Sequence, residues 1–280
     1  MVIALIAGAA VAHATWNVTL KRTGATGVTF LWLAFVVGAV ALTPFGIVAL
    51  AGVDLAHWLG FAAVSGVLQV GYFLLLQRAY RVGDVSIVYP LARGSGPLLS
   101  VILAIVLLGE RPSVVALIGA AVVIGGVVTI GLAGDRRLNR AGVIYGLAVG
   151  VVIAVYTLWD STAVTAGGMP PVGLYWGTTA VQAVLLAPAA LREARLAATA
   201  RAHPVAIVIV GILAPLAYIL VLMAVQLAPV SLVAPAREVS VVLVGLAGWL
   251  LFREPRPVQR LAGAAIVLIG VAILVNSIEH

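Results

Sequence analysis

Four charged side chains interrupt segments of the chain that are otherwise apolar: Arg93, Asp160, Arg237 and Glu238. A guanidinium group binds a carboxylate or a phosphate through two parallel hydrogen bonds, and a carboxylate can accept a proton or bind an ammonium group. A charged side chain that faces lipid costs at least ~2.5–3.5 kcal/mol. We therefore expect all four groups to point into the protein or into a water-filled cavity, where they are candidates for binding an ionic small molecule.

Aromatic and polar side chains form two similar trios near these charges. Each trio has the spacing i, i+3, i+4 that places its members on one helix face. The trios are His13, Trp16 and Asn17, and Tyr156, Trp159 and Asp160. They either form two walls of one cavity or are interfacial tryptophans with hydrogen bonds between helices. Further lining candidates are Tyr72, Tyr89, Gln69, Tyr218 and Gln226, whereas Tyr175 and Trp176 are predicted to lie in an interfacial belt.

The composition places these residues in a membrane. Of 280 residues, 64% are hydrophobic and only 9% are charged, which is too little polar surface for a soluble protein of this length. The net charge of +7 is spread over many loops and forms no patch, so nucleic-acid binding is not expected. Cysteine is absent, which excludes disulfides and thiolate metal sites. The first apolar segment is predicted to be a retained span and not a signal peptide.

Ten apolar segments have the length of membrane spans. They are predicted at 2–20, 28–51, 57–80, 85–108, 113–132, 142–165, 172–191, 205–227, 229–252 and 258–275. Because hydrocarbon cannot satisfy backbone polar groups, each span must be a helix, and the fold class is all-α. The linker "AGDRRLNRAG" at 133–142 divides the chain into two sets of five, and the loop at 192–203 is predicted to form a short surface helix.

The two sets of five look like copies of each other. "VSIVYPLAR" at 85–93 resembles "VSLVAPAR" at 230–237, and "LIGAAVVIGGV" at 117–127 resembles "LAGAAIVLIGV" at 261–271, an offset of 144. The two trios correspond at an offset of 143. Because five is odd, the second copy must enter the membrane from the opposite side. We therefore predict two inverted five-helix repeats, 1–134 and 141–280, in one membrane domain with a site between them.

The positive charges predict the orientation. Of the 16 Lys and Arg residues, 13 belong to odd-numbered loops or the neighbouring span ends, and only Arg111 lies in an even-numbered loop. The positive-inside rule then places the odd-numbered loops in the cytoplasm and both termini outside, in a multi-pass protein of the cell (inner or plasma) membrane.

Prolines and glycines surround the two embedded arginines. Pro90 precedes Arg93 by three residues, and Pro235 precedes Arg237 by two. Each proline removes a backbone donor and bends its helix, and span four carries more weak points in Gly94, Gly96 and Pro97. We predict that these five residues form hinges or gates. Adjacent helical residues point about 100° apart, so Arg237 and Glu238 are predicted to be poor partners for each other.

Three short motifs carry a family resemblance. "HATWNVTLK" at 13–21, "YPLARG" at 89–94 and "GER" at 109–111 resemble the EamA-like, ten-helix permeases of the drug/metabolite transporter superfamily. The resemblance covers the whole chain and implies an inner-membrane carrier that moves small metabolites, often outward. It also implies a central cavity lined by helices one, three, four, six, eight and nine. The second copy departs from the pattern, because "REVSV" at 237–241 replaces "RGSGP" and "FREP" at 252–255 replaces "GERP".

These observations predict a secondary active transporter, an exporter or exchanger, of a small polar metabolite such as an amino acid, working by alternating access. The alternative is a carrier of organic or quaternary ammonium cations that uses an aromatic cage. The expected partners are the lipid bilayer and the substrate, with protons as a candidate coupling ion. No cofactor or metal is expected, and the motifs of a membrane enzyme are missing. The predicted substrate-binding residues are Arg93, Arg237, Glu238, Asp160, Asn17, Trp16, His13, Tyr89, Tyr72, Tyr156 and Trp159.

Overall fold

The structure is a computed structural model that describes residues 1–24, 27–83, 85–131, 140–252 and 257–277. Every regular element in these ranges is a helix. The helices are α1 (Val2–Thr23), α2 (Val28–Ala49), α3 (Leu55–Val82), α4 (Val85–Leu108), α5 (Val114–Gly131), α6 (Arg140–Val164), α7 (Pro171–Arg192), α8 (Leu196–Ala202), α9 (Pro204–Val225), α10 (Val230–Ala236), α11 (Val239–Phe252) and α12 (Pro257–Asn276). Most of the linker predicted at 133–142 and most of the "FREP" segment lie outside the described residues.

The helices have the length and composition of membrane spans. Within the described ranges, nine helical segments are long and apolar enough to cross a membrane, and Val114–Ile130 is a shorter apolar helix. Their positions match the predicted spans closely. The short helix predicted in the loop at 192–203 is confirmed, because α8 lies there and has no buried residue.

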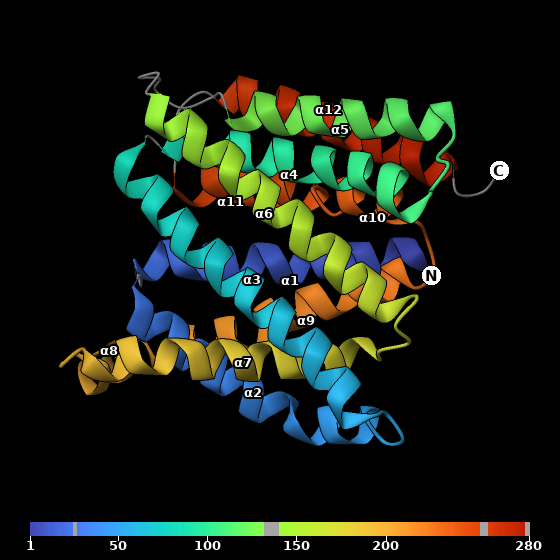
Figure 1. The fold of residues 1–280 in the computed structure, drawn as a ribbon. Helices are drawn as coiled ribbons and strands as arrows, with labels where there is room; N and C mark the ends of the chain where they lie inside the picture. Colours follow the sequence, from blue (N-terminus) through green and yellow to red (C-terminus); the bar gives the residue numbers. More distant parts are fainter. Residues whose placement is uncertain (25–26, 84, 132–139, 253–256, 278–280) are drawn as a thin grey trace.

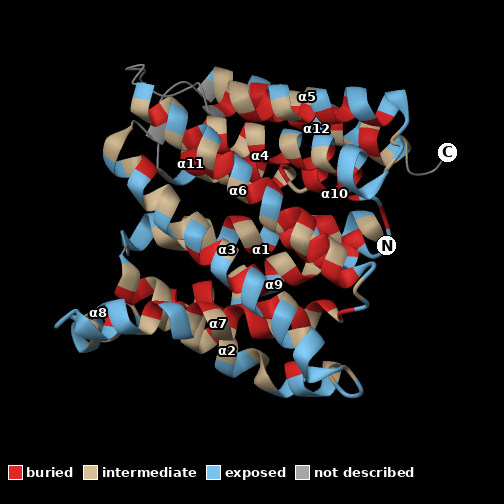
Figure 2. Cartoon of the chain, in the orientation of Figure 1, coloured by how far each residue is buried: buried red, intermediate tan, exposed pale blue. Residues whose placement is uncertain are grey.

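The helices lie side by side in one bundle (Figure 1). α5 and α12 pack together at the top of this view and α2 and α7 at the bottom, with the other long helices between them. α1 begins and α12 ends on one side of the bundle, whereas α8 lies on the opposite side. Buried residues concentrate inside the bundle (Figure 2), and large apolar side chains such as Val106, Leu107 and Val184 are exposed. A surface of this kind suits contact with lipid.

The predicted hinge segments differ in the structure. Helix α4 runs without a break through Pro90, Gly94, Gly96 and Pro97. The predicted ninth span is instead divided, since α10 ends at Ala236 and α11 begins at Val239. Pro235 lies just before this break and has no backbone N–H to donate to the Ser231 carbonyl. At the break the Glu238 N–H bonds to the Pro235 carbonyl and the Ser240 N–H to the Arg237 carbonyl, so the backbone changes to the tighter i→i−3 bonding of a 3₁₀ turn.

Glycines allow α5 and α12 to approach closely in an antiparallel pair. A methyl group added to Gly126 would lie 2.7 Å from the Val267 nitrogen and 2.8 Å from the Gly263 oxygen. A methyl group added to Gly270 would lie 2.9 Å from the Gly119 oxygen. Small residues at such crossings allow backbone contact, which drives helix association in lipid.

We expect Gly126→Ala to destabilise the protein and Gly125→Ala to leave its stability unchanged or slightly raised. At Gly125 an added methyl group has no neighbour within 4 Å, whereas at Gly126 it meets backbone atoms. Overpacking of this kind costs about 1–3 kcal/mol. The melting temperature in detergent, followed by tryptophan fluorescence, should fall by several degrees for Gly126→Ala only. Equal melting temperatures for the two variants would contradict this account of the α5–α12 pair.

Candidate functional site

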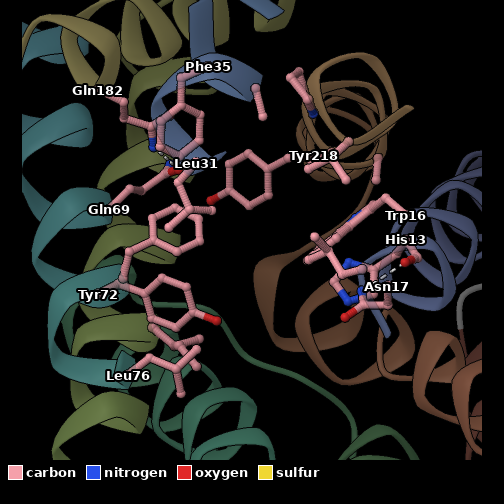
Figure 3. Close-up of a pocket in the computed structure, with 18 of the residues that line it drawn as sticks. His13, Trp16, Asn17, Leu31, Phe35, Gln69, Tyr72, Leu76, Gln182 and Tyr218 are labelled. Carbon is pink, nitrogen blue, oxygen red and sulfur yellow. Dashed lines mark hydrogen bonds between the residues drawn. The ribbon is translucent and has the colours of Figure 1, made fainter. Parts of the chain in front are cut away.

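A cavity of about 670 Å³ lies at the centre of the bundle. Its walls come from α1, α2, α3, α4, α6, α7, α9 and the start of α11. It extends from His13, near the middle of α1, to Gly27 in the α1–α2 turn and Arg81 at the end of α3. His13, Trp16 and Asn17 lie on one side of it, and Tyr72 and Leu76 lie across from them (Figure 3).

Tyrosines dominate the polar part of the cavity wall. Six of the seven tyrosines in the chain line it, namely Tyr72, Tyr80, Tyr89, Tyr156, Tyr175 and Tyr218. Four of them form a continuous series of ring contacts. The ring centroids are 5.8 Å apart for Tyr72 and Tyr156, 6.0 Å for Tyr156 and Tyr218, and 4.9 Å for Tyr175 and Tyr218. The wall thus offers both aromatic faces and hydroxyl groups to a bound molecule.

Arg93 lies on the cavity wall and contacts three other polar groups. Its Nη2 is 2.9 Å from His13 Nε2 and its Cζ is 5.7 Å from the centre of the Tyr89 ring. Because a guanidinium group only donates, His13 Nε2 must be the acceptor, which assigns the ring proton to Nδ1. Nη1 of Arg93 is 3.7 Å from Glu238 Oε1, and the Arg93 side chain remains 16% exposed. A guanidinium in this setting has donors left for a ligand in the cavity.

Arg237 and Glu238 form a close ion pair but share no hydrogen bond, so the prediction that they are poor partners holds for hydrogen bonding and not for distance. Arg237 Nε is 3.4 Å from Glu238 Oε1. Both residues lie between α10 and α11. Glu238 is 1% exposed and lies between the two guanidinium groups, yet neither of its oxygens has a hydrogen-bond partner among the described residues. Glu238 therefore interacts with the two guanidinium groups through charge alone and not through hydrogen bonds.

The first trio and the second trio meet the cavity differently. His13, Trp16 and Asn17 all line it, and Asn17 also donates from Nδ2 to the His13 carbonyl, 2.8 Å away. From the second trio only Tyr156 is among the lining residues. The Trp159 indole donates to the carbonyl of Phe61, 3.1 Å away, and thereby anchors α6 to α3.

Asp160, the third member of the second trio, lies behind the cavity wall. It is 0% exposed. Its Oδ2 accepts hydrogen bonds from Gln69 Nε2 at 3.0 Å and from the Tyr218 hydroxyl at 2.8 Å. The Gln69 Oε1 in turn accepts from the Tyr175 hydroxyl at 3.2 Å and from Gln182 Nε2 at 3.0 Å. This buried network joins four helices, α3, α6, α7 and α9, beside the cavity.

Some residues of the site were missed or misplaced by the sequence. Tyr175 was predicted in an interfacial belt, but it is buried and belongs to the network, whereas its neighbour Trp176 stacks on Trp58 with ring centroids 5.5 Å apart. Gln182 was not singled out, although a lone amide in an apolar span is a signal for a buried polar contact. Gln226 does not line the cavity and instead donates to the Val164 carbonyl, 3.1 Å away.

A further carboxylate closes the end of the bundle away from Gly27. Glu110, in the turn between α4 and α5, accepts from two backbone N–H groups at the start of α10. Its Oε1 is 2.8 Å from the Val230 nitrogen and its Oε2 is 2.9 Å from the Ser231 nitrogen. Together with the Gln226 contact, this interaction ties the turns at this end of the molecule together.

Comparisons with known proteins fit this architecture. The family model described as the EamA-like transporter family matches residues 1–132 and 140–276. A solved structure titled "Crystal structure of protein" superposes with a TM-score of 0.77 over 97% of this chain and 95% of that chain, at 18% sequence identity. At this level of identity the likeness concerns the fold alone. No curated protein matches the chain.

Proposed function

Since the chain belongs to the EamA-like transporter family, we propose that this multi-pass membrane protein is a secondary active carrier, an exporter or exchanger, of a small polar metabolite such as an amino acid. The observation that carries the proposal is the central cavity of about 670 Å³ with the guanidinium groups of Arg93 and Arg237 deep in its wall. A carrier needs such a pocket to enclose its substrate.

The charges at the cavity favour a substrate with an acidic group. Arg93 and Arg237 share one carboxylate, that of Glu238. Among the described residues no second carboxylate lies within 4.0 Å of either arginine, so one positive charge lacks compensation in a membrane-embedded site, which is unfavourable unless an anion joins it. A substrate carboxylate can bind a guanidinium through two hydrogen bonds. The tyrosine hydroxyls and the His13, Asn17 and Trp16 side chains would hold the remaining parts of the substrate.

We propose that ten spans form two inverted repeats, 1–134 and 141–280. Reciprocal contacts support this. The sequence offset of 144 relates Gly119 to Gly263 and Gly126 to Gly270, and in the structure Gly126 approaches Gly263 while Gly119 approaches Gly270. Such exchange of equivalent partners in an antiparallel pair is the signature of a twofold axis perpendicular to the helices. An axis of that kind lies in the membrane plane and relates oppositely inserted halves.

The remaining helix pairs support the same symmetry. α3 packs on α6 and α7, and α9, the equivalent of α3 in the second repeat, packs on α1 and α2, the equivalents of α6 and α7. Each half therefore completes its bundle with helices of the other half. Rocking of such halves around a central site is the general mechanism of alternating access.

The shape of the cavity corresponds to one state of this cycle. It reaches the end of the bundle that carries Gly27 and Arg81, while Glu110 and Gln226 make their contacts at the other end. The arginine- and lysine-rich turns at the open end favour a cytoplasmic location for it. We therefore assign the state as inward-open, in the inner or plasma membrane, with both termini outside.

A carrier of organic or quaternary ammonium cations remains the second candidate. The observation that favours it is the series of tyrosine rings in the cavity, because aromatic faces attract such cations. The two arginines oppose it, since a permanent cation without an acidic group adds to the uncompensated positive charge.

Amino acids are expected to raise the melting temperature of the purified carrier, and choline-like cations are not. A ligand present at about 100 times its dissociation constant stabilises the folded state by ~2.7 kcal/mol. Compounds that stabilise the protein should then show trans-stimulated exchange in proteoliposomes, as expected of a carrier and not of a channel. Stabilisation and exchange by quaternary ammonium compounds alone would favour the second candidate.

A further inference from the structure

The two carboxyl groups buried inside the bundle have opposite electrostatic surroundings. Glu238 lies 3.7 Å from Arg93 and 3.4 Å from Arg237. Among the described residues, these are the ion pairs within 4.0 Å in the bundle interior, so Asp160 takes part in none. Two guanidinium groups therefore face the Glu238 carboxyl group directly.

Asp160 has only neutral groups as direct partners. Gln69 and Tyr218 donate to Oδ2, and the Ser65 hydroxyl lies beside the carboxyl group. Its Oδ1 is buried and has no hydrogen-bond partner among the described residues. Two or three neutral donors do not offset the cost of an isolated buried charge. A carboxyl group in this position therefore favours its neutral, protonated form or requires a cation beside it.

In the part of the chain that the structure describes, no cation lies within 4.0 Å of Asp160. The titratable groups nearest to Asp160 are Tyr218 of α9, which donates to it, Tyr156 of α6 and Tyr175 of α7. Tyr72 of α3 lies one ring further away, against Tyr156. Arg237 reaches α6 one turn away, where its Nη1 donates to the Thr157 hydroxyl at 3.4 Å. Arg93 of α4 is directed to His13 and Glu238.

A proton can reach Asp160 from the cavity, whereas a larger cation would first have to move the side chains that cover it. The carboxyl group is fully buried and absent from the cavity wall, but its partners Gln69 and Tyr218 are both on that wall. A substrate ammonium group or a hydrated metal ion would have to displace both side chains. A proton would not, because the Tyr218 hydroxyl already connects the cavity to Oδ2.

We propose that Asp160 is the proton-binding site of this carrier and that Tyr218 is the residue through which the proton passes. A hydronium ion in the cavity protonates the Tyr218 oxygen while the original hydroxyl proton moves to Asp160 Oδ2. The hydrogen bond between them then runs from Asp160 to Tyr218, and a water molecule is left in the cavity. Release follows the same path in reverse. This assignment rests on the proposed transport function, which it deepens by separating the roles of the two buried carboxyls.

Infrared spectroscopy of the purified protein tests the protonation without any substrate. The wild-type protein should gain the carbonyl stretch of a buried, protonated carboxylic acid as the pH is lowered and lose it as the pH is raised. Asp160→Asn should remove this band and Glu238→Gln should keep it. Tyr218→Phe, which removes one hydrogen bond and keeps the carboxyl group, should shift the band in frequency. A band that survives Asp160→Asn, or that Glu238→Gln removes, would overturn the assignment.

Transport in proteoliposomes tests the role of this proton, with a radiolabelled amino-acid mixture as the probe. Asp160→Asn should exchange the label across the membrane as the wild type does, but a pH gradient should no longer drive its accumulation. Tyr218→Phe should slow the gradient-driven component severalfold. Gradient-driven accumulation by Asp160→Asn at the wild-type level would refute the inference and leave the proposed function intact. If even the wild type fails to move the mixture, the proposed substrate class fails, and the infrared result still decides on Asp160.

Discussion

Replacing Arg93 by glutamine is expected to abolish transport while the protein still folds and inserts. The guanidinium lies on the cavity wall, remains partly exposed and keeps donors free for a ligand. Each hydrogen bond between a charged pair contributes about 1.5–3 kcal/mol. Loss of a two-bond contact with a substrate carboxylate therefore corresponds to a decrease in affinity of roughly a hundredfold or more. At substrate concentrations near the wild-type KM, transport should therefore fall to about 2% of the wild-type rate, close to the level of protein-free liposomes.

Arg201→Gln provides the matched control. Arg201 lies on the exposed helix α8, where it meets neither the cavity nor a buried carboxylate, so transport should be unchanged. Wild-type transport by Arg93→Gln, measured at equal amounts of inserted protein, would reject the role of Arg93 in binding.

The double variant Arg93→Gln/Glu238→Gln separates binding from packing. Removing Arg93 alone leaves Glu238 buried beside Arg237 without its second ion pair, and breaking a buried ion pair commonly costs about 3–5 kcal/mol. Removing both charges should restore much of the melting temperature that Arg93→Gln loses. Transport should stay absent in the double variant. Recovery of transport together with stability would mean that Arg93 acts only by balancing Glu238.

The span positions were predictable because a membrane helix has a simple signature. Twenty apolar residues with polar ends identify it, and the predicted tenth span, 258–275, differs from α12 by one residue at each end. The break in the ninth span was not predictable in the same way. Pro90 and Pro97 also interrupt the backbone bonding of α4, yet that helix continues. Whether a proline bends or divides a helix depends on the neighbouring helices that satisfy the freed backbone groups.

The candidate site was predictable as a set of residues but not as an arrangement. The chemistry of Arg93, Arg237, Glu238 and Asp160 marks them in the sequence, since charges in spans are rare. Helix periodicity places the members of a trio on one face but does not say which neighbour that face meets. α6 is flanked by α3 and α4, so Trp159 anchors to α3 and Asp160 lies behind the wall. The close approach of Arg93 to Glu238 joins α4 to the segment between α10 and α11, and such a contact between distant segments is not encoded in helix periodicity.

Replacing Glu110 by glutamine is expected to open the closed end of the bundle. The carboxylate binds the backbone N–H groups of Val230 and Ser231, and a carboxylate acceptor makes stronger bonds than a neutral amide, which has only one oxygen to offer. Every ~1.4 kcal/mol lost from this contact shifts the population tenfold towards the state in which α10 separates from the α4–α5 turn. We therefore expect about a tenfold or larger increase in that population.

The absence of cysteine makes this opening directly measurable. Ser231 is 2% exposed, so Ser231→Cys should react slowly with a maleimide in the otherwise wild-type protein and about ten times faster when combined with Glu110→Gln. Ser113→Cys is the matched control, because Ser113 is exposed in the same region and should react at the same rate in both backgrounds. If the Ser231→Cys rate does not change, Glu110 only caps α10. If it rises while the Ser113→Cys rate stays constant, the contact holds this end shut, and its release is the step that alternating access requires at this side of the membrane.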